Sequence, residues 1–137
     1  MLISNIVNGV NTKLAGETMT FNQLKLFLSE TIDDINRELC AAYPSFDDLN
    51  ESDNYNYFPD KYIRSVVITG AAYKFYETDE EGIVTATQYH YDYVDNLFYM
   101  KRDYSCSVPT EYQDADRGYV IGPELRAGVT LGMTGWC

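Results

Sequence analysis

The 137-residue sequence is poor in histidine, in cysteine and in positive charge, and each shortage excludes a class of protein. It has one histidine and three cysteines, and its 10 basic residues face 21 acidic ones, for a formal net charge of −11. The lone His90 leaves little material for acid–base chemistry, and no glycine-rich phosphate loop, GxSxG elbow or HExxH helix occurs. Cys40, Cys106 and Cys137 lack the close spacing of a disulfide framework or a zinc site. We therefore predict that the protein is not an enzyme and has no catalytic, cofactor-binding or metal-binding residues.

The sequence also lacks a long apolar run and a basic leader. Its richest apolar stretch, residues 63–75, is interrupted by Arg64 and Lys74, whereas a membrane span needs about 20 apolar residues. The first 17 residues have no basic segment ahead of an apolar one, so no secretory signal is expected. A diffuse nucleic-acid binder carries a basic field, and the charge here has the opposite sign. These features predict a protein of the cytoplasm that enters no membrane and does not bind DNA sequence-specifically.

What the sequence does contain is helical periodicity, and the predicted fold class is mainly α with a three-helix core. Apolar residues recur at three- and four-residue spacing over residues 20–43, with Thr18 or Thr20 as the expected N-cap. Pro44 is the expected end of this first helix, because the residue before a proline is driven out of the α region.

The second and third helices follow a long loop, residues 44–58. Pro59 is suited to the first position of the second helix, which runs to an acidic turn at residues 77–82. The third helix is predicted at about residues 83–104. The expected buried face of the third helix consists of Ala86, His90, Tyr93, Val94, Leu97, Met100 and Tyr104.

The third helix has more aromatic residues than one buried face can use. Tyr91, Phe98 and Tyr99 widen its apolar surface beyond what a three-helix monomer can cover. Tyrosine is common at protein–protein interfaces, where one end of the side chain is apolar and the other is hydrated. We therefore predict that these three residues contact a neighbouring subunit, and that His90 is a core or interface residue. The alternative that the tyrosines stack nucleobases is less favoured, because basic residues are too few and scattered.

Two segments flank the predicted core. Residues 1–19, which contain the turn-forming pair Asn8-Gly9, are expected to form a short strand or helical turn and then a loop. Residues 1–104 would form the core, and residues 105–137 an extended or β-hairpin C-terminal arm, because glycine recurs there and helical periodicity stops. The apolar side chains of this arm are predicted to dock on a partner: Tyr119, Val120, Ile121, Leu125, Val129, Leu131 and Trp136.

Acidic residues cluster in the loop at 44–58 and in the turn at 77–82. A calcium loop needs alternate ligands, a central glycine and a closing glutamate, and neither segment has that order. Imitation of DNA phosphates by these acids is a second hypothesis. Solvated loops are the simplest interpretation, and we prefer it.

In layout, the chain resembles the small head–tail connector (adaptor) proteins of tailed bacteriophages. The resemblance is carried by three blocks, TFNQLKLFLSETIDDINREL, FPDKYIRSVVITGAAYKFYE and TATQYHYDYVDNLFYMKRDY, separated by an acidic, tyrosine-rich loop and an acidic turn. These blocks and their connections span residues 20–104, about 60% of the chain. The glycine-rich ending has no counterpart in the resemblance.

The resemblance implies a structural protein of the virion, assembled in the cytoplasm of the host bacterium. Subunits of this kind form a ring, commonly a dodecamer, beneath the portal protein, and the ring extends the DNA channel toward a downstream tail component. Strong acidity suits this role, because a negative channel wall repels the phosphate backbone and lets DNA pass. The alternative is a small acidic inhibitor, encoded by a phage or plasmid, that binds a host protein as a DNA mimic.

Overall fold

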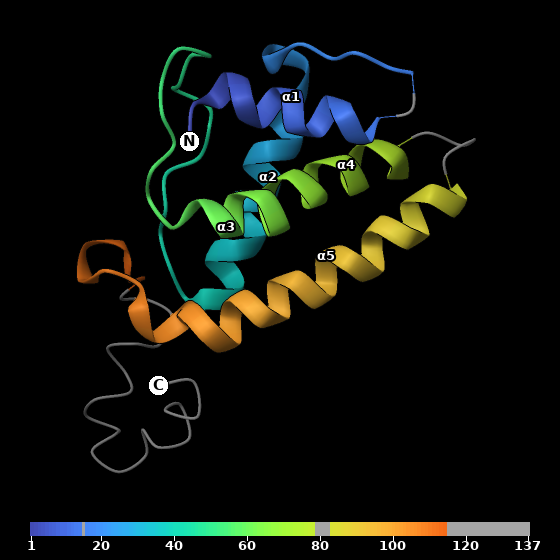
Figure 1. Cartoon of the computed structure of the whole chain (residues 1–137). Helices are drawn as coiled ribbons and strands as arrows, with labels where there is room; N and C mark the ends of the chain where they lie inside the picture. The colour runs from blue at the N-terminus through green and yellow to red at the C-terminus, as the bar shows by residue number, and fades with distance from the viewer. Residues whose placement is uncertain (15, 79–82, 115–137) are drawn as a thin grey trace.

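The computed structural model describes residues 1–14, 16–78 and 83–114, and this part of the chain is mainly α, as predicted (Figure 1). Four helices make up the body of the described residues, so the predicted three-helix core was one helix short, and these residues contain no strand, only two isolated β-bridges. The helices are α1 (Ile3–Lys13), α2 (Phe21–Leu39), a continuous helix made of α3 (Asp60–Tyr62), a π-helical turn (Ile63–Val67) and α4 (Ile68–Glu77), and α5 (Ile83–Tyr104).

The N-terminal segment forms a helix of 11 residues, so the prediction of a short strand or helical turn was wrong, whereas the loop predicted after it is present at residues 16–20. Helix α1 buries four apolar residues at helical spacing: Ile3, Ile6, Val7 and Val10. Asn8-Gly9 was interpreted as a turn, but Gly9 lies within the helix for a different reason. A Cβ at position 9 would lie 2.7 Å from Cδ1 of Ile68, so glycine lets α1 approach α4 closely.

Helix α2 begins as predicted and ends earlier than predicted. Thr20 and Gln23 form a capping box, in which each side chain accepts a hydrogen bond from the other residue's backbone N–H. The helix ends at Cys40, which has a left-handed backbone with φ of 51°, and not at Pro44. The side chain of Asn36 then bonds both the N–H and the C=O of Tyr43, which holds the chain as it turns away.

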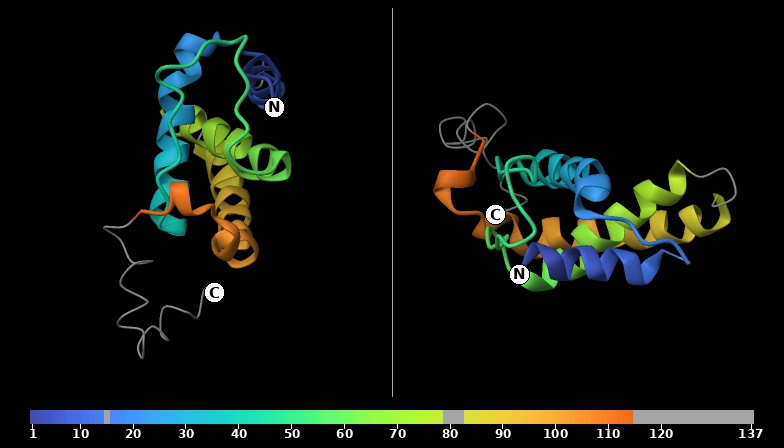
Figure 2. Two further views of the ribbon diagram at one scale, coloured as in Figure 1. Left: turned by 90° about the vertical axis from the view of Figure 1, so that its left-hand side faces the viewer. Right: turned by 90° about the horizontal axis from the view of Figure 1, so that it is seen from above.

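Helix α4 is the centre of the packing and contacts α1, α2 and α5. In Figure 1, α1 lies above α4, α5 lies below it and α2 crosses behind, and the left view of Figure 2 shows α2 to one side of α4 and α5. Helix α4 is narrow at Gly70, where two other helices approach it closely. A Cβ at Gly70 would lie 2.7 Å from both Thr31 Cγ2 on α2 and Tyr93 Cε1 on α5.

The loop at 44–58 covers the core with aromatic side chains. Phe46 and Tyr55 are fully buried and stack with their ring centroids 4.4 Å apart. The Tyr55 hydroxyl donates to the carbonyl of Pro44 at 2.5 Å, and its backbone N–H donates to the carbonyl of Met1. Asp48 and its acidic neighbours are exposed, so the loop combines a solvated rim with a buried aromatic base.

The first ten residues of the predicted C-terminal arm lie on the helical body. They form two 3₁₀ turns, Ser105–Ser107 and Thr110–Tyr112. The ring of Tyr112 packs against Tyr43, and Asp114 N–H donates to the carbonyl of Cys40 at the end of α2. The predicted docking residues of the arm, from Tyr119 to Trp136, lie outside the described residues.

Candidate protein interaction surface

Helix α5 packs on α4 and α2 through one face only. Its buried residues are Ala86, Tyr93 and Met100, with Tyr89, Leu97 and Tyr104 partly buried beside them. His90 and Val94 were predicted on this face, but the structure exposes both. The buried residues Ala86, Tyr93 and Met100 are spaced seven apart and define the side of α5 that faces the core. His90 and Val94 lie beyond one edge of this buried face.

The opposite side of α5 presents large apolar side chains to solvent. Val84 is 75% exposed, Tyr91 66%, Phe98 53%, Tyr99 48% and Val94 47%. We call these five residues the α5 surface. Single exposed apolar residues are ordinary, but several on one helix face are typical of an interaction site. All three predicted interface residues belong to this surface, and their contact with a neighbouring subunit stays a prediction.

A cluster of polar groups holds α5 in this orientation. The carboxylate of Asp34 on α2 accepts hydrogen bonds from Tyr93 Oη on α5 at 2.7 Å and from Lys74 Nζ on α4 at 2.8 Å. Arg37 pairs with the same carboxylate at 2.7 Å. Burial alone would raise the pKa of Asp34, but these hydrogen bonds and charges outweigh it and hold the pKa below its ordinary value. Burial, followed by the bond to Asp34, raises the pKa of Tyr93.

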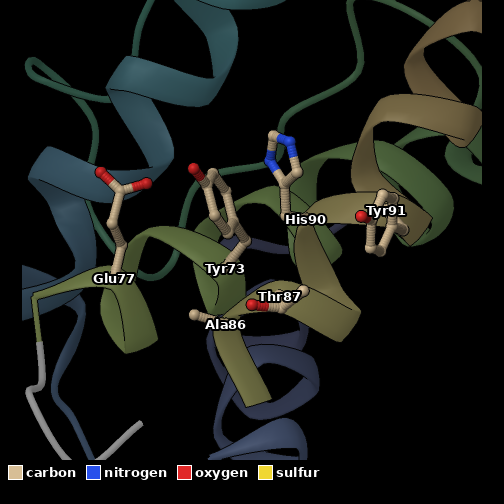
Figure 3. A pocket seen from close by; sticks show the side chains of 6 residues that line it. All are labelled: Tyr73, Glu77, Ala86, Thr87, His90 and Tyr91. Atoms are coloured by element: carbon tan, nitrogen blue, oxygen red, sulfur yellow. The ribbon is translucent and has the colours of Figure 1, made fainter. Parts of the chain in front are cut away.

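At its N-terminal end the α5 surface continues into a pocket of about 270 Å³ between α4 and α5 (Figure 3). The pocket is lined by Tyr73, Glu77, Ala86, Thr87, His90 and Tyr91. Figure 3 shows the side chains of Glu77, Tyr73 and His90 standing side by side along one wall.

One carboxylate and three rings define the chemistry of the pocket. The Tyr73 hydroxyl donates to the Glu77 carboxylate, and this bond is the largest cause that raises the pKa of Tyr73 to about 12. The rings of Tyr73 and His90 lie 5.0 Å apart, and His90 and Tyr91 lie 6.0 Å apart. A carboxylate flanked by aromatic rings suits a cationic group such as a guanidinium.

The described residues include no candidate metal site. Among them, no group of three or more His, Cys, Asp or Glu side chains could hold a metal ion. No helix in residues 1–14, 16–78 and 83–114 is long and apolar enough to cross a membrane.

Sequence reasoning identified the aromatic part of the α5 surface and missed the pocket. Glu77 and His90 lie on different helices, and periodicity within one helix carries no information about which residues of a second helix face it. Glu77 was grouped with the acidic turn and interpreted as solvated.

Comparison of the chain with protein-family models, with curated proteins and with solved structures finds no match. The resemblance to phage connector proteins therefore stays a prediction. The surface and charge of the described residues are the physical basis for assigning a function.

Proposed function

We propose that the protein is a structural subunit of a bacteriophage virion, a head–tail adaptor that forms a ring beneath the portal. The observation that carries this proposal is the α5 surface, an uncovered aromatic face on a small helical body whose core is otherwise well packed. In the proposal, this face is covered by an adjacent subunit. The ring has about twelve copies, as the resemblance of residues 20–104 implies.

A ring needs two different surfaces on each subunit, because each copy contacts the next in a head-to-tail manner. The α5 surface supplies one of them. The predicted arm, an extended or β-hairpin segment with Tyr119, Ile121, Leu125 and Trp136 among its apolar residues, supplies the other. The portal protein and a downstream tail component are the remaining partners in this proposal.

Charge supports a channel in which DNA passes without sequence-specific contact. The formal net charge of −11 is large for 137 residues, and acids such as Asp48 and Glu51 are exposed. A negative wall repels phosphates and lowers friction along the duplex. No catalytic step, cofactor or membrane contact belongs to the proposed role.

Quantitative mass spectrometry of purified virions tests the proposal. An adaptor is present in the mature particle, at about twelve copies for each portal ring. The alternative, an inhibitor of a host protein, acts in the infected cell and is absent from the virion. Absence of the chain from purified particles would therefore contradict the adaptor role.

A further inference from the structure

The α5 surface and the pocket at its end form one continuous strip, because Tyr91 belongs to both. From Val84 to Phe98 the strip follows 14 helical steps, a length of about 21 Å at 1.5 Å for each residue. Its composition is apolar along α5 and anionic at the pocket, where Glu77 lies among aromatic rings. Asp92 and Asp95 are exposed beside the apolar residues and add to the negative charge.

We propose that this strip binds residues 118–137 of a second copy of the chain, with the guanidinium of Arg126 in the pocket beside Glu77. The choice of a second copy, in place of the same copy, rests in part on the proposed ring. The apolar side chains of the segment would cover Tyr91, Val94 and Phe98.

Charge favours this occupant over another part of the protein. Arg117 and Arg126 balance Asp116 and Glu124, so the whole excess of 11 acids lies in residues 1–114. Two helical bodies therefore repel each other, whereas the segment that follows Asp114 carries no net charge. This segment supplies apolar side chains and an arginine, which together match an apolar strip with an anionic end.

Arg126 fits the pocket better than Arg117 does. Leu125 and Val129 flank Arg126, so a guanidinium in the pocket would have apolar neighbours that continue along the α5 surface. In the described part of the chain Glu77 has no ion pair, and its partner is the Tyr73 hydroxyl. A guanidinium can pair with the carboxylate and stack on a ring in the same position.

The place where the described chain ends favours a second copy. Asp114 is held by the carbonyl of Cys40 at the end of α2, and α5 turns its buried face toward α2 and α4. Figure 2 shows the turns at 105–112 passing from the end of α5 across to α2. The strip lies on the opposite side of α5, so the segment would have to pass around α5 to reach the strip of its own body.

A charge exchange in the full-length chain tests the proposal. Glu77→Arg and Arg126→Glu each place like charges in the pocket, so each variant alone should need about tenfold or more higher concentration to self-associate than the natural chain. Mixing the two variants restores a Glu–Arg pair at every contact between unlike copies. The mixture and the double variant Glu77→Arg/Arg126→Glu should therefore associate like the natural chain. Analytical ultracentrifugation measures all of these masses.

Asp48→Arg is the matched control, because it makes the same change of charge on an exposed loop away from α5. It should associate like the natural chain, and circular dichroism should show equal helix content in every variant. Single variants that associate normally would overturn the proposal. A natural chain that stays monomeric, or a mixture that fails while the double variant recovers, would also overturn docking on a second copy.

The same experiment separates this inference from the proposed function. Association that follows the charge exchange, together with absence from virions, would contradict the adaptor role and support the docking. Presence in the virion, together with single variants that associate like the natural chain, would support the adaptor role and contradict the docking.

Discussion

The hydroxyl of Tyr93 donates a hydrogen bond of 2.7 Å to the carboxylate of Asp34, which ties α5 to α2 near the middle of α5. Lys74 of α4 donates to the same oxygen, Oδ2 of Asp34, at 2.8 Å, so three helices meet at one carboxylate. Because Tyr93 faces this cluster, Tyr91 and Val94 are turned to solvent. This polar contact therefore supports the orientation of α5 that its buried residues Ala86, Tyr93 and Met100 establish.

Tyr93→Phe should destabilise the protein by about 2 kcal/mol, the usual range for a hydrogen bond to a charged group being roughly 1.5–3 kcal/mol. Asp34→Asn should cost a similar amount, since Lys74 then loses its ionic partner. Urea unfolding followed by circular dichroism measures both. Tyr57→Phe is the matched control, because Tyr57 lies in the loop at 44–58 and its hydroxyl makes no hydrogen bond with a described residue, and it should change the free energy of unfolding by less than about 0.5 kcal/mol.

At acid pH, the difference in the free energy of unfolding between the natural chain and Asp34→Asn should become smaller. The pKa of Asp34 is lowered on folding, so the unfolded chain binds its proton more readily and the contribution to stability exists above the ordinary value of 3.8. It is lost as the pH falls through the lowered pKa. Unfolding free energies of both chains at pH 7 and near pH 3 should converge at the lower pH, and a difference that stays constant would contradict this account.

At alkaline pH, stability should be lost as the pH rises, through the ionisation of Tyr93. The pKa of Tyr93 is raised on folding, so its contribution is complete below the unfolded value of 10.0 and is lost as the pH rises above it. The natural chain should therefore lose more stability between pH 9 and pH 11 than Tyr93→Phe does. Equal losses would show that Tyr93 is not the group responsible.

Two glycines allow a paired test of helix packing. Gly70→Ala brings a Cβ to 2.7 Å from Thr31 Cγ2 and from a ring carbon of Tyr93, neither of which is free to move, and should cost about 1–3 kcal/mol. Gly9→Ala meets only the terminal methyl of Ile68, which can rotate, and alanine favours helix by about 1 kcal/mol. The midpoint of thermal unfolding should be well lower for Gly70→Ala than for Gly9→Ala. The opposite order would contradict the packing described.

Truncation of the α5 surface should affect association and leave folding intact. Phe98→Ala removes a half-exposed ring and should weaken assembly by about 2 kcal/mol if the ring is a central interface contact. Leu26→Ala is the control, because Leu26 is 62% exposed on α2, away from this surface. Ultracentrifugation of both variants gives the comparison, and equal assembly would count against an interface on α5.

Deletion of residues 118–137 should leave the helical body folded and prevent it from joining its partner. The described core ends at Asp114, whose backbone is bonded to Cys40, so the deletion removes none of the described contacts. Thermal melting followed by circular dichroism should give a midpoint close to that of the full chain, while association is lost. A shortened chain that is unfolded would show that these residues belong to the core.

The fold could be predicted from the sequence where residues within a single helix determine its bounds. The bounds of α5, residues 83–104, follow from its periodicity, and the start of α2 follows from the Thr20 capping box. The end of α2 was less predictable, because the left-handed conformation of Cys40 depends on how the chain is held beyond it and not on the residue type.

Features that depend on pairs of helices could not be predicted. Gly9 is a turn signal when read locally, and only the approach of Ile68 shows that it is a packing position. The Asp34 cluster joins three helices, and nothing in the spacing of one helix identifies Lys74 as a partner. The pocket at Glu77 is hidden from sequence for the same reason.

Electron microscopy of the purified full-length protein, alone and mixed with the portal ring of its phage, tests the central claim most directly. The account predicts ring-shaped particles of about twelve copies that stack coaxially on the portal. Particles no larger than a monomer or dimer in both samples, with the portal left bare, would contradict it.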